Sequence, residues 1–221
     1  MAMQIRFMIG FSLYWNLKML ELDRHYTTEY KFITGIDEAG RGPLAGPLVV
    51  AAVTISADFE IEGLNDSKKL SDKKRRKLYQ QIKDEVIDFE IVTIFREEID
   101  EINILQATMK GMGLACEGLQ MQGVILVDGN RLPEILAERG AEAIVKGDQK
   151  VSAIAAASIL AKVYRDDIMI ELDKTYPEYG FCHNKGYGTK QHLQAIEKHG
   201  ITPHHRRSYA PVAQQTLYFE R

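Results

Sequence analysis

Apolar and polar residues recur with two different periods from residue 31 onward, which predicts strands and helices in turn. Phe32 to Asp37 predicts a first strand. Leu48 to Ile55 (LVVAAVTI) predicts a second strand, joined to the first by a loop of glycine and proline. Phe89 to Phe95 alternates as a third strand. Two shorter apolar runs, Gly123 to Val127 and Ala143 to Val145, predict a fourth and a fifth strand.

Helical spacing separates several of these strands. Residues 71–86 predict a helix that begins at Ser71 as N-cap, and Ser152 to about Thr175 predicts one whose Ala and Ser residues let it lie close to the sheet. A last helix is predicted from about Lys190 to Lys198, ended by Gly200. The longest predicted helix runs from about Glu98 to Gln120, with a buried face of Leu105, Met109, Met112, Cys116 and Leu119.

This order of elements, β-β-α-β-α-β-β-α-α, favours a mixed sheet with helices on its faces, an α/β layered domain. The 221 residues suit one domain, and 45% hydrophobic and 27% charged residues are ordinary for a soluble protein. The net charge of −3 excludes a generic polyanion binder, so a nucleic-acid site needs local basic clusters.

Cys116 and Cys182 are the two cysteines, which excludes a disulfide framework and a C-x-x-C zinc site and favours a reducing, cytoplasmic location. The apolar run 7–15 is too short to span a membrane and lacks the flanks of a signal peptide. It predicts a helix or arm that packs on the domain, with a disordered leader as the alternative.

Acidic residues end two of the predicted strands. Asp37 and Glu38 close the first strand, where regular alternation would point them to opposite faces and a glycine-rich bend could turn both toward one site. Asp128 ends the fourth strand, and Asp148 precedes the Ala-rich helix. Each acid alone also fits a solvated strand end, a turn or a helix cap. Together they provide the oxygen ligands that Mg²⁺ or Mn²⁺ prefers, and two such ions can drive phosphodiester cleavage.

Basic residues cluster in two places. The run 66–77 holds seven basic residues against two acidic ones, which fits either a solvated helix face or a surface for phosphates. Residues 183–207 hold five of the six histidines; their spacing fits no standard metal site and indicates a basic flank for nucleic acid. Tyr187 is predicted on an exposed loop, as a stacking platform or an ordinary turn residue. The Gly40, Gly42, Gly46 spacing is not a dinucleotide fingerprint, because a strand follows instead of a helix.

Six segments, in this order, resemble the ribonuclease HII family closely. They are GIDEAGRGPLAGPLVVAAV (35–53), NDSKKLS (65–71), VDGNRLP (127–133), KGDQKVSAIAAASILAKVYRD (146–166), YGFCHNKGYGT (179–189) and HHRRSYAPV (204–212). The resemblance implies a ribonuclease H-like fold: an N-terminal extension (1–30), a catalytic domain (31–178) and a helical, basic C-terminal segment (179–221) that completes the substrate site.

The same resemblance implies the chemistry. Asp37, Glu38, Asp128 and Asp148 would hold two Mg²⁺ or Mn²⁺ ions for metal-assisted attack of water on phosphorus, leaving 3′-hydroxyl and 5′-phosphate ends. The substrates would be RNA/DNA hybrids and DNA that contains ribonucleotides. The backbone of Gly40, Arg41 and Gly42 would sense the ribose 2′-hydroxyl, Tyr187 would stack on the next deoxyribose, Ser67, Lys68 and Arg41 would contact phosphates, and Asp166 would support the four acids.

Three features depart from the family or extend beyond it. Asn184 stands where relatives usually carry a histidine, which the neighbouring His183 makes tolerable, and residues before Lys31 match poorly. A type 3 ribonuclease H would need an extra domain ahead of the first acid pair, which favours type 2 here. Residues 214–219 (QQTLYF) resemble the Gln-x-x-Leu-x-Phe peptide that docks on bacterial sliding clamps, although a plain tail fits as well.

We expect a monomer with no membrane contact. A different nuclease on the same fold and a non-catalytic nucleic-acid-binding module remain alternatives.

Overall fold

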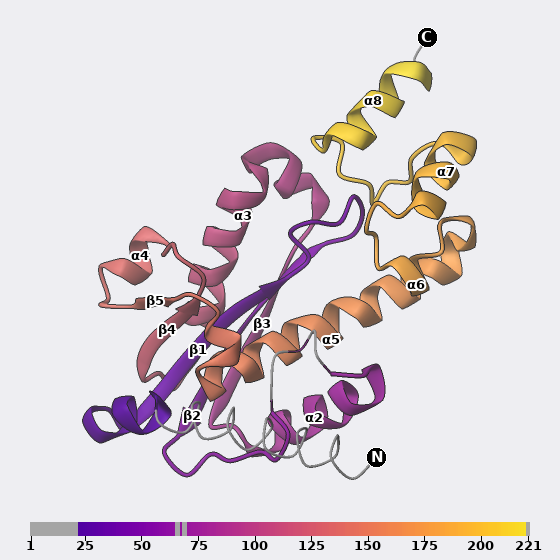
Figure 1. Cartoon of the computed structure of the whole chain (residues 1–221). Helices are drawn as coiled ribbons and strands as arrows, with labels where there is room; N and C mark the ends of the chain where they lie inside the picture. Colours follow the sequence, from indigo (N-terminus) through magenta and orange to yellow (C-terminus); the bar gives the residue numbers. More distant parts are fainter. Residues whose placement is uncertain (1–21, 65–66, 68–69, 220–221) are drawn as a thin grey trace, which may run out of the picture.

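A computed structural model describes residues 22–64, 67 and 70–219, with the backbone alone for 215–219. Its centre is a five-stranded sheet in the order β3-β2-β1-β4-β5 (Figure 1). β2 lies antiparallel between β1 and β3, whereas β4 runs parallel to β1 and β5 parallel to β4. The predicted mixed five-stranded sheet is therefore confirmed. The strands are β1 (Phe32–Ala39), β2 (Leu48–Ser56), β3 (Asp88–Ile94), β4 (Val124–Asp128) and β5 (Glu142–Ile144).

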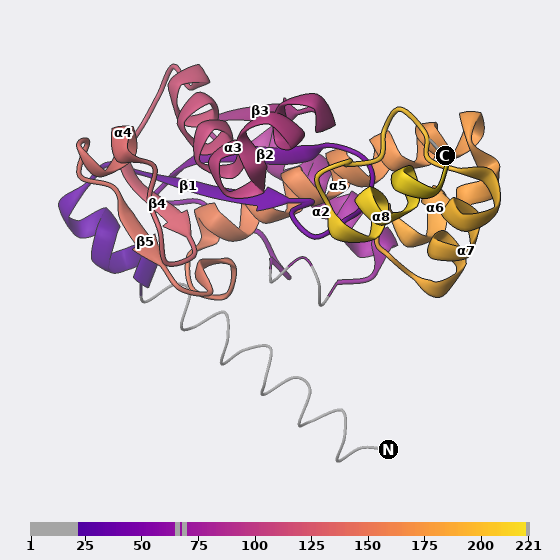
Figure 2. The same cartoon turned by 90° about the horizontal axis from the view of Figure 1, so that it is seen from above.

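Helices cover both faces of this sheet, which confirms the layered α/β class (Figure 2). α3 lies on one face, and α5 with α2 lies on the other, while the C-terminal helices gather beyond one end of the sheet. The elements are α2 (Asp72–Glu85), α3 (Arg96–Gly118), α4 (Glu134–Ala137), η2 (Gly147–Gln149), α5 (Ser152–Thr175), η3 (Pro177–Tyr179), α6 (Phe181–Asn184), α7 (Lys190–His199) and α8 (Ala210–Phe219).

Strand alternation divides the core into two layers. Ile33 and Val53 point toward α5, and Ile36 and Val50 point toward α3. α5 packs very close to β1, because a Cβ atom added to Gly35 would lie 2.2 Å from the carbonyl carbon of Ala153. The Ala-rich sequence of α5 and the missing side chain at Gly35 make this close approach possible.

α3 is not the single regular helix that its spacing predicts. Asn103 interrupts it with a φ of 66°, which asparagine adopts more readily than most residues. The Asn103 Oδ1 accepts hydrogen bonds from the N–H groups of Leu105 (3.0 Å) and Gln106 (3.1 Å), so Asn103 caps a second helical segment. Met112, Cys116 and Leu119 of the predicted face are buried, but Leu105 and Met109 are only partly covered.

Two predicted helix boundaries are confirmed. The Ser71 hydroxyl accepts a hydrogen bond from the N–H of Lys74 at 3.4 Å, and Gly200 ends α7 with a φ of 79°. The structure adds a helix over 22–29, which precedes the predicted core. Its Tyr26 is buried in the layer that contains α5, and the Tyr26 hydroxyl donates to Glu142 on β5 (2.9 Å).

The apolar run 7–15 lies outside the described residues. Among the helices in the described ranges, none combines the length and the apolar character that crossing a membrane requires.

Candidate active site

Asp37 and Glu38 lie within the regular part of β1, not in a bend. β1 continues to Ala39, and Asp37 and Glu38 are paired with Ala51 and Val50 of β2. The expected glycine bend begins one residue later, at Gly40, whose φ is 104°. Regular alternation therefore directs Asp37 toward α5 and Glu38 toward α3 at the carboxyl end of the strand.

The parallel pairing of β1 with β4 brings Asp128 to the same edge of the sheet. Val127 is paired with Ile36, so Asp128 follows beside Asp37. The Asp128 Oδ1 accepts a hydrogen bond from the N–H of Gly147 (2.6 Å), and Asp148 is the next residue, buried in η2. Three separate segments thus meet where ligand sites of such sheets gather.

The carboxyl group of Asp37 is the most strongly perturbed of this group. Burial raises its pKa well above the ordinary value, and the nearby charges of Glu38 and Asp128 raise the pKa further. Hydrogen bonds from the Ser158 hydroxyl and from the N–H of Glu38 (2.7 Å) act in the opposite direction. Glu38 and Asp128 therefore both lie close enough to Asp37 to affect its ionisation.

The donor set fits a hard divalent cation. The four acids supply oxygen atoms alone, and a cation would relieve the repulsion among three neighbouring carboxylates. Within the described ranges, no three His, Cys, Asp or Glu side chains are already grouped as metal ligands. The acids are therefore adjacent in the fold without being drawn together around one point.

A cavity of about 290 Å³ lies beside these acids. The loop of Gly40, Arg41 and Gly42 forms one wall, and a Cβ added to Gly42 would lie 3.4 Å from the ring of Tyr187. Tyr187 is 45% exposed, as its loop position predicts. Glu38 lines this cavity and also a neighbouring one of about 370 Å³, which Asp128 lines as well.

The residues expected to contact phosphates lie differently from one another. Arg41 is half exposed and forms an ion pair with Glu38 (3.3 Å). Ser67 is buried at the edge of the smaller cavity, where its hydroxyl is 2.9 Å from the hydroxyl of Ser158. Lys68 lies outside the described residues, as do three of its neighbours in the run 65–69.

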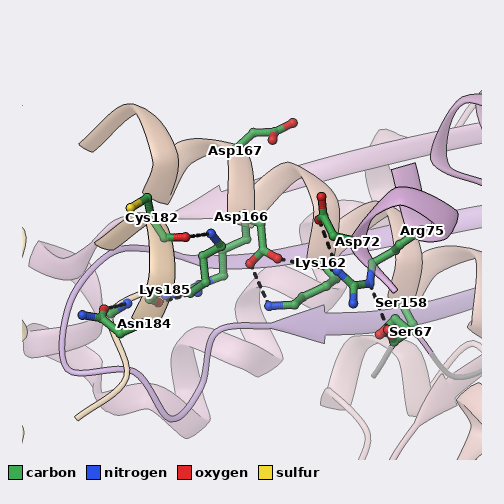
Figure 3. Close-up of polar contacts among 12 residues, drawn as sticks. Ser67, Asp72, Arg75, Ser158, Lys162, Asp166, Asp167, Cys182, Asn184 and Lys185 are labelled. Carbon is green, nitrogen blue, oxygen red and sulfur yellow. Dashed lines mark hydrogen bonds and ion pairs between the residues drawn. The ribbon is translucent and has the colours of Figure 1, made fainter. Parts of the chain in front are cut away.

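Lys162 is a cavity residue that the sequence interpretation missed. It lines the cavity from α5 and pairs with Asp166 (2.7 Å), which also faces Arg75 at 3.9 Å (Figure 3). Arg75 is buried and donates to the carbonyl oxygens of Ser67 (2.9 Å) and Leu70 (2.8 Å), so one residue of the basic run is structural. The four-residue spacing of Lys162 and Asp166 was the available signal, since it places both on one helix face.

The basic flank predicted over 183–207 is only partly correct. His192, His205 and Arg206 are fully buried, so they cannot form a basic surface. His192 and His205 instead face each other with 3.0 Å between their Nε2 atoms. Lys190 and Arg207 are exposed, as a basic flank requires.

Asn184 supports the loop that carries Tyr187. Its side-chain nitrogen donates to the carbonyl of Tyr179 (2.7 Å), and its side-chain oxygen accepts from the N–H of Gly186 (2.8 Å). The neighbouring His183 is exposed, so Asn184 shapes the turn through its own amide.

Comparison with known proteins agrees with this architecture. The family described as Ribonuclease HII matches residues 34–212. A ribonuclease HII of Francisella tularensis is 55% identical over 181 residues, which cover 81% of this chain and 96% of that protein.

Two solved structures are similar in fold. The ribonuclease H2 of Pyrococcus horikoshii OT3 has a TM-score of 0.72 at 29% identity, covering 86% of this chain and 99% of that one. The ribonuclease HII in a PCNA:RNase HII complex from Archaeoglobus fulgidus has a TM-score of 0.66 at 28% identity, covering 80% and 95%. The predicted ribonuclease H-like fold is confirmed. The chain therefore belongs to the ribonuclease HII family, whose members are ribonuclease H endonucleases.

Proposed function

We propose that this chain hydrolyses the RNA strand of RNA/DNA hybrids and nicks duplex DNA on the 5′ side of an embedded ribonucleotide, leaving 3′-hydroxyl and 5′-phosphate ends. The observation that carries the proposal is the position of Glu38. It lines the cavity formed by Gly42 and Tyr187 and also the cavity that Asp128 lines. A strand that passes between these walls would bring a phosphodiester bond to the carboxylates.

Asp37, Glu38, Asp128 and Asp148 are the proposed ligands of two Mg²⁺ or Mn²⁺ ions. When bound, such ions activate water and stabilise the leaving oxygen in phosphodiester hydrolysis. Hydrogen bonds orient two of these carboxylates. The N–H of Gly147 donates to the Asp128 carboxylate, and the Ser158 hydroxyl donates to that of Asp37. Asp37 and Glu38, on opposite faces of β1, would approach the ions from two sides.

The cavity supplies the proposed selectivity. The backbone of Gly40, Arg41 and Gly42 would contact the ribose 2′-hydroxyl, the group that distinguishes RNA from DNA. The exposed ring of Tyr187 would stack on the following deoxyribose, and Arg41, Ser67 and Lys68 would contact phosphates. A nuclease specific for DNA alone has no use for a 2′-hydroxyl contact.

The test is cleavage of a labelled DNA duplex that carries one ribonucleotide, with Mg²⁺, with Mn²⁺ and with chelator. We expect a metal-dependent nick 5′ of the ribonucleotide and none in the all-DNA duplex. Cleavage of long hybrids without this nick would contradict the recognition roles proposed for the backbone of residues 40–42 and for Tyr187. Binding without any cleavage would favour a non-catalytic module, and cutting of all-DNA duplex would favour another nuclease.

Asp37→Asn tests the carboxylate site directly. The substitution keeps the shape of the side chain and removes one negative oxygen, so we expect cleavage to fall at least about a thousandfold while the fold persists. Asp84→Asn, on the exposed side of α2, is the matched control and should keep full activity. Full activity of Asp37→Asn would contradict the metal-site assignment.

We further propose that the C-terminal peptide 214–219 docks on a sliding clamp. The sequence pattern supports this, as does the complex of an archaeal ribonuclease HII with PCNA. The backbone over 210–219 is helical, and Gln214 is exposed. A pulldown with a bacterial sliding clamp should recover the full chain but not a chain that ends at Ala213, and equal recovery of the two would contradict the proposal. A cytoplasmic location and a monomeric state stay predictions.

A further inference from the structure

The buried guanidinium group of Arg206 donates hydrogen bonds to the backbone of the glycine loop, which comprises residues 40–47 between β1 and β2. Arg206 is fully buried, and its Nη2 donates to the carbonyl of Gly40 (2.6 Å) and its Nη1 to that of Arg41 (3.0 Å). Its Nε donates to the carbonyl of Gly46 (3.0 Å). One planar fork therefore fixes three carbonyl groups of the loop, which the single ammonium group of lysine could not match.

Tyr209 binds both the glycine loop and the side chain of Arg206. Its hydroxyl donates to the carbonyl of Arg41 (2.6 Å) and accepts a hydrogen bond from the Nη1 of Arg206 (3.0 Å). The guanidinium carbon of Arg206 also lies 5.2 Å from the centre of the Tyr209 ring. The Arg41 carbonyl is therefore held by two donors that also hold each other.

A second buried guanidinium fixes the far end of the loop. Arg165 on α5 donates to the carbonyls of Pro47 (2.9 Å) and Ala45 (3.2 Å). It also donates to the carbonyl of Lys185 (3.0 Å), two residues before Tyr187. The glycine loop and the Tyr187 loop are thus anchored to the same residue.

The direction of these carbonyls decides where the loop presents its N–H groups. The peptide bonds that join Gly40, Arg41 and Gly42 are trans, so the N–H of each points away from the carbonyl of the residue before it. Because Arg206 binds the carbonyls of Gly40 and Arg41, the N–H groups of Arg41 and Gly42 point away from Arg206. Arg41 and Gly42 line the cavity, and in the described part of the chain no acceptor is recorded for either N–H.

We propose that Arg206 and Tyr209 are positioning residues that set the preference for a ribonucleotide, by holding the N–H groups of Arg41 and Gly42 toward the cavity. This inference rests on the proposed function, since it assigns the donors that would meet the 2′-hydroxyl. Neither residue touches substrate; both act through the backbone. In this way, residues of the C-terminal segment determine the preference for a ribonucleotide, and N–H groups of the β1–β2 loop make the contact.

The test compares Tyr209→Phe and Arg206→Lys with wild type, and uses Tyr176→Phe as the matched control. Tyr176 packs against the same C-terminal core as Tyr209, where its ring contacts those of Tyr179 and His204. Two quantities are measured: kcat/KM on the duplex with one ribonucleotide, and the inhibition constant of an all-DNA duplex of the same sequence. The product of the two quantities stays constant when duplex binding alone weakens, and it falls when ribonucleotide recognition is lost.

We expect kcat/KM to fall about tenfold for Tyr209→Phe and further for Arg206→Lys, with the inhibition constant of the all-DNA duplex unchanged within about twofold. Tyr176→Phe should behave as wild type. An unchanged kcat/KM in both variants, or a fall in kcat/KM matched by an equal rise of the inhibition constant, would overturn the proposal.

Amide hydrogen exchange over 39–47 gives a readout that does not depend on activity. Tyr209→Phe and Arg206→Lys should exchange faster there than wild type and Tyr176→Phe, whereas the rest of β1 should not change. If wild type does not cut the ribonucleotide substrate, the proposed function fails, and exchange still decides whether Arg206 and Tyr209 hold the loop. Unchanged exchange in both variants would overturn the positioning role.

Discussion

At the scale of single residues, the two glycines on either side of Arg41 have different structural roles. Gly40 has a φ of 104°, and a Cβ there would lie 2.2 Å from the Nε of Arg165. Gly42 has no such backbone constraint, and a Cβ there would meet only the Tyr187 ring, at 3.4 Å. Gly40 is therefore needed for the fold of the loop and Gly42 for the width of the cavity.

Alanine substitutions should separate these roles. We expect Gly40→Ala to lower the free energy of unfolding by about 1–3 kcal/mol, because it strains the backbone and displaces a buried guanidinium. Gly42→Ala should keep the stability of wild type and raise KM for a ribonucleotide-containing duplex. Urea unfolding and steady-state kinetics on both variants provide the measurement; a stability loss confined to Gly42→Ala would contradict this division.

Two buried histidines form a chain of hydrogen bonds that requires both to be neutral. The N–H of Thr202 donates to the Nδ1 of His205 (2.9 Å), so the proton of His205 is on Nε2 and points to the Nε2 of His192. His192 then donates from Nδ1 to the carbonyl of Tyr187 (2.9 Å). Burial, with a smaller contribution from the neighbouring His192, lowers the pKa of His205 to about 3.

This arrangement should weaken the fold in acid. The pKa of His205 in the folded state lies below its ordinary value of 6.5, so its contribution to stability is complete above about pH 6.5 and declines as the pH falls toward 3. The decline is roughly 1.4 kcal/mol per pH unit for one histidine. We expect His205→Gln to be less stable than wild type at pH 7.5 in urea unfolding, by a margin that shrinks toward pH 5. His199→Gln, an exposed control, should show no such trend.

The residue scale is also where sequence reasoning was least complete. The family motifs predicted the acids, the glycine loop and Tyr187 as site residues, because each lies in a short segment that resembles the family. They did not indicate that His192, His205 and Arg206 are buried, since a run of basic residues looks the same whether it faces water or backbone carbonyls. Only the tertiary structure supplies those carbonyls.

At the scale of elements, the strands could be predicted to within a few residues because each is a short apolar or alternating run. The end of β1 could not be predicted. Gly40 indicates a bend, but the sequence does not show at which residue the pairing of β1 with β2 ends. α3 was predicted as unbroken for a related reason. The apolar period continues across Asn103, and the positive φ there depends on a side-chain hydrogen bond that periodicity does not contain.

The start of α5 depends on Asp23, which lies in the N-terminal segment that matches the family poorly. Val151 provides no side-chain cap, and the N–H of Ser152 instead donates to the Oδ1 of Asp23 (3.1 Å), from the helix over 22–29. Burial raises the pKa of Asp23 to about 6, against the effect of the Ser152 hydrogen bonds. The segment 22–29 thus caps the helix that supports Asp37.

Removing this cap should cost about 1 kcal/mol of stability in Asp23→Ala. Asp23→Asn keeps an acceptor and should retain the bond. Because the folded-state pKa of Asp23 is raised, ionisation weakens the wild-type fold as the pH rises from about 4 through 6, and Asp23→Asn should lack this dependence. Thermal unfolding of the three proteins at pH 4 and pH 7.5 measures both effects. A wild-type pH dependence shared by Asp23→Asn would exclude Asp23 as its source.

At the scale of the whole molecule, the division between 31–178 and 179–221 stays a prediction, but hydrogen bonds cross it at several points. The N–H of Leu44 donates to the carbonyl of Gly186 (2.7 Å), and the N–H of Gly46 to that of His204 (2.9 Å). Arg165 and Arg206 cross the same boundary in opposite directions. Each side therefore donates hydrogen bonds to a loop of the other.

We therefore expect residues 31–178 and 179–214 to unfold together. Hydrogen exchange measured by mass spectrometry across a urea series should give one midpoint for peptides from both parts. An earlier midpoint for 179–214, with 39–47 still protected, would show that the C-terminal segment is an independent unit.

The contact between Gly35 and Ala153 has a consequence for engineering this enzyme. With helix backbone directly against strand backbone, the spacing between β1 and α5 is fixed by main-chain atoms and offers no side chain to exchange. The part of α5 around Ala153 therefore offers nothing to redesign, although Lys162, further along the same helix, lines the cavity. The other side is different, because Leu105 and Met109 are flexible, partly covered side chains beside Asp128. A mutant library aimed at new substrates should therefore sample the second segment of α3 and leave the start of α5, around Ala153, untouched.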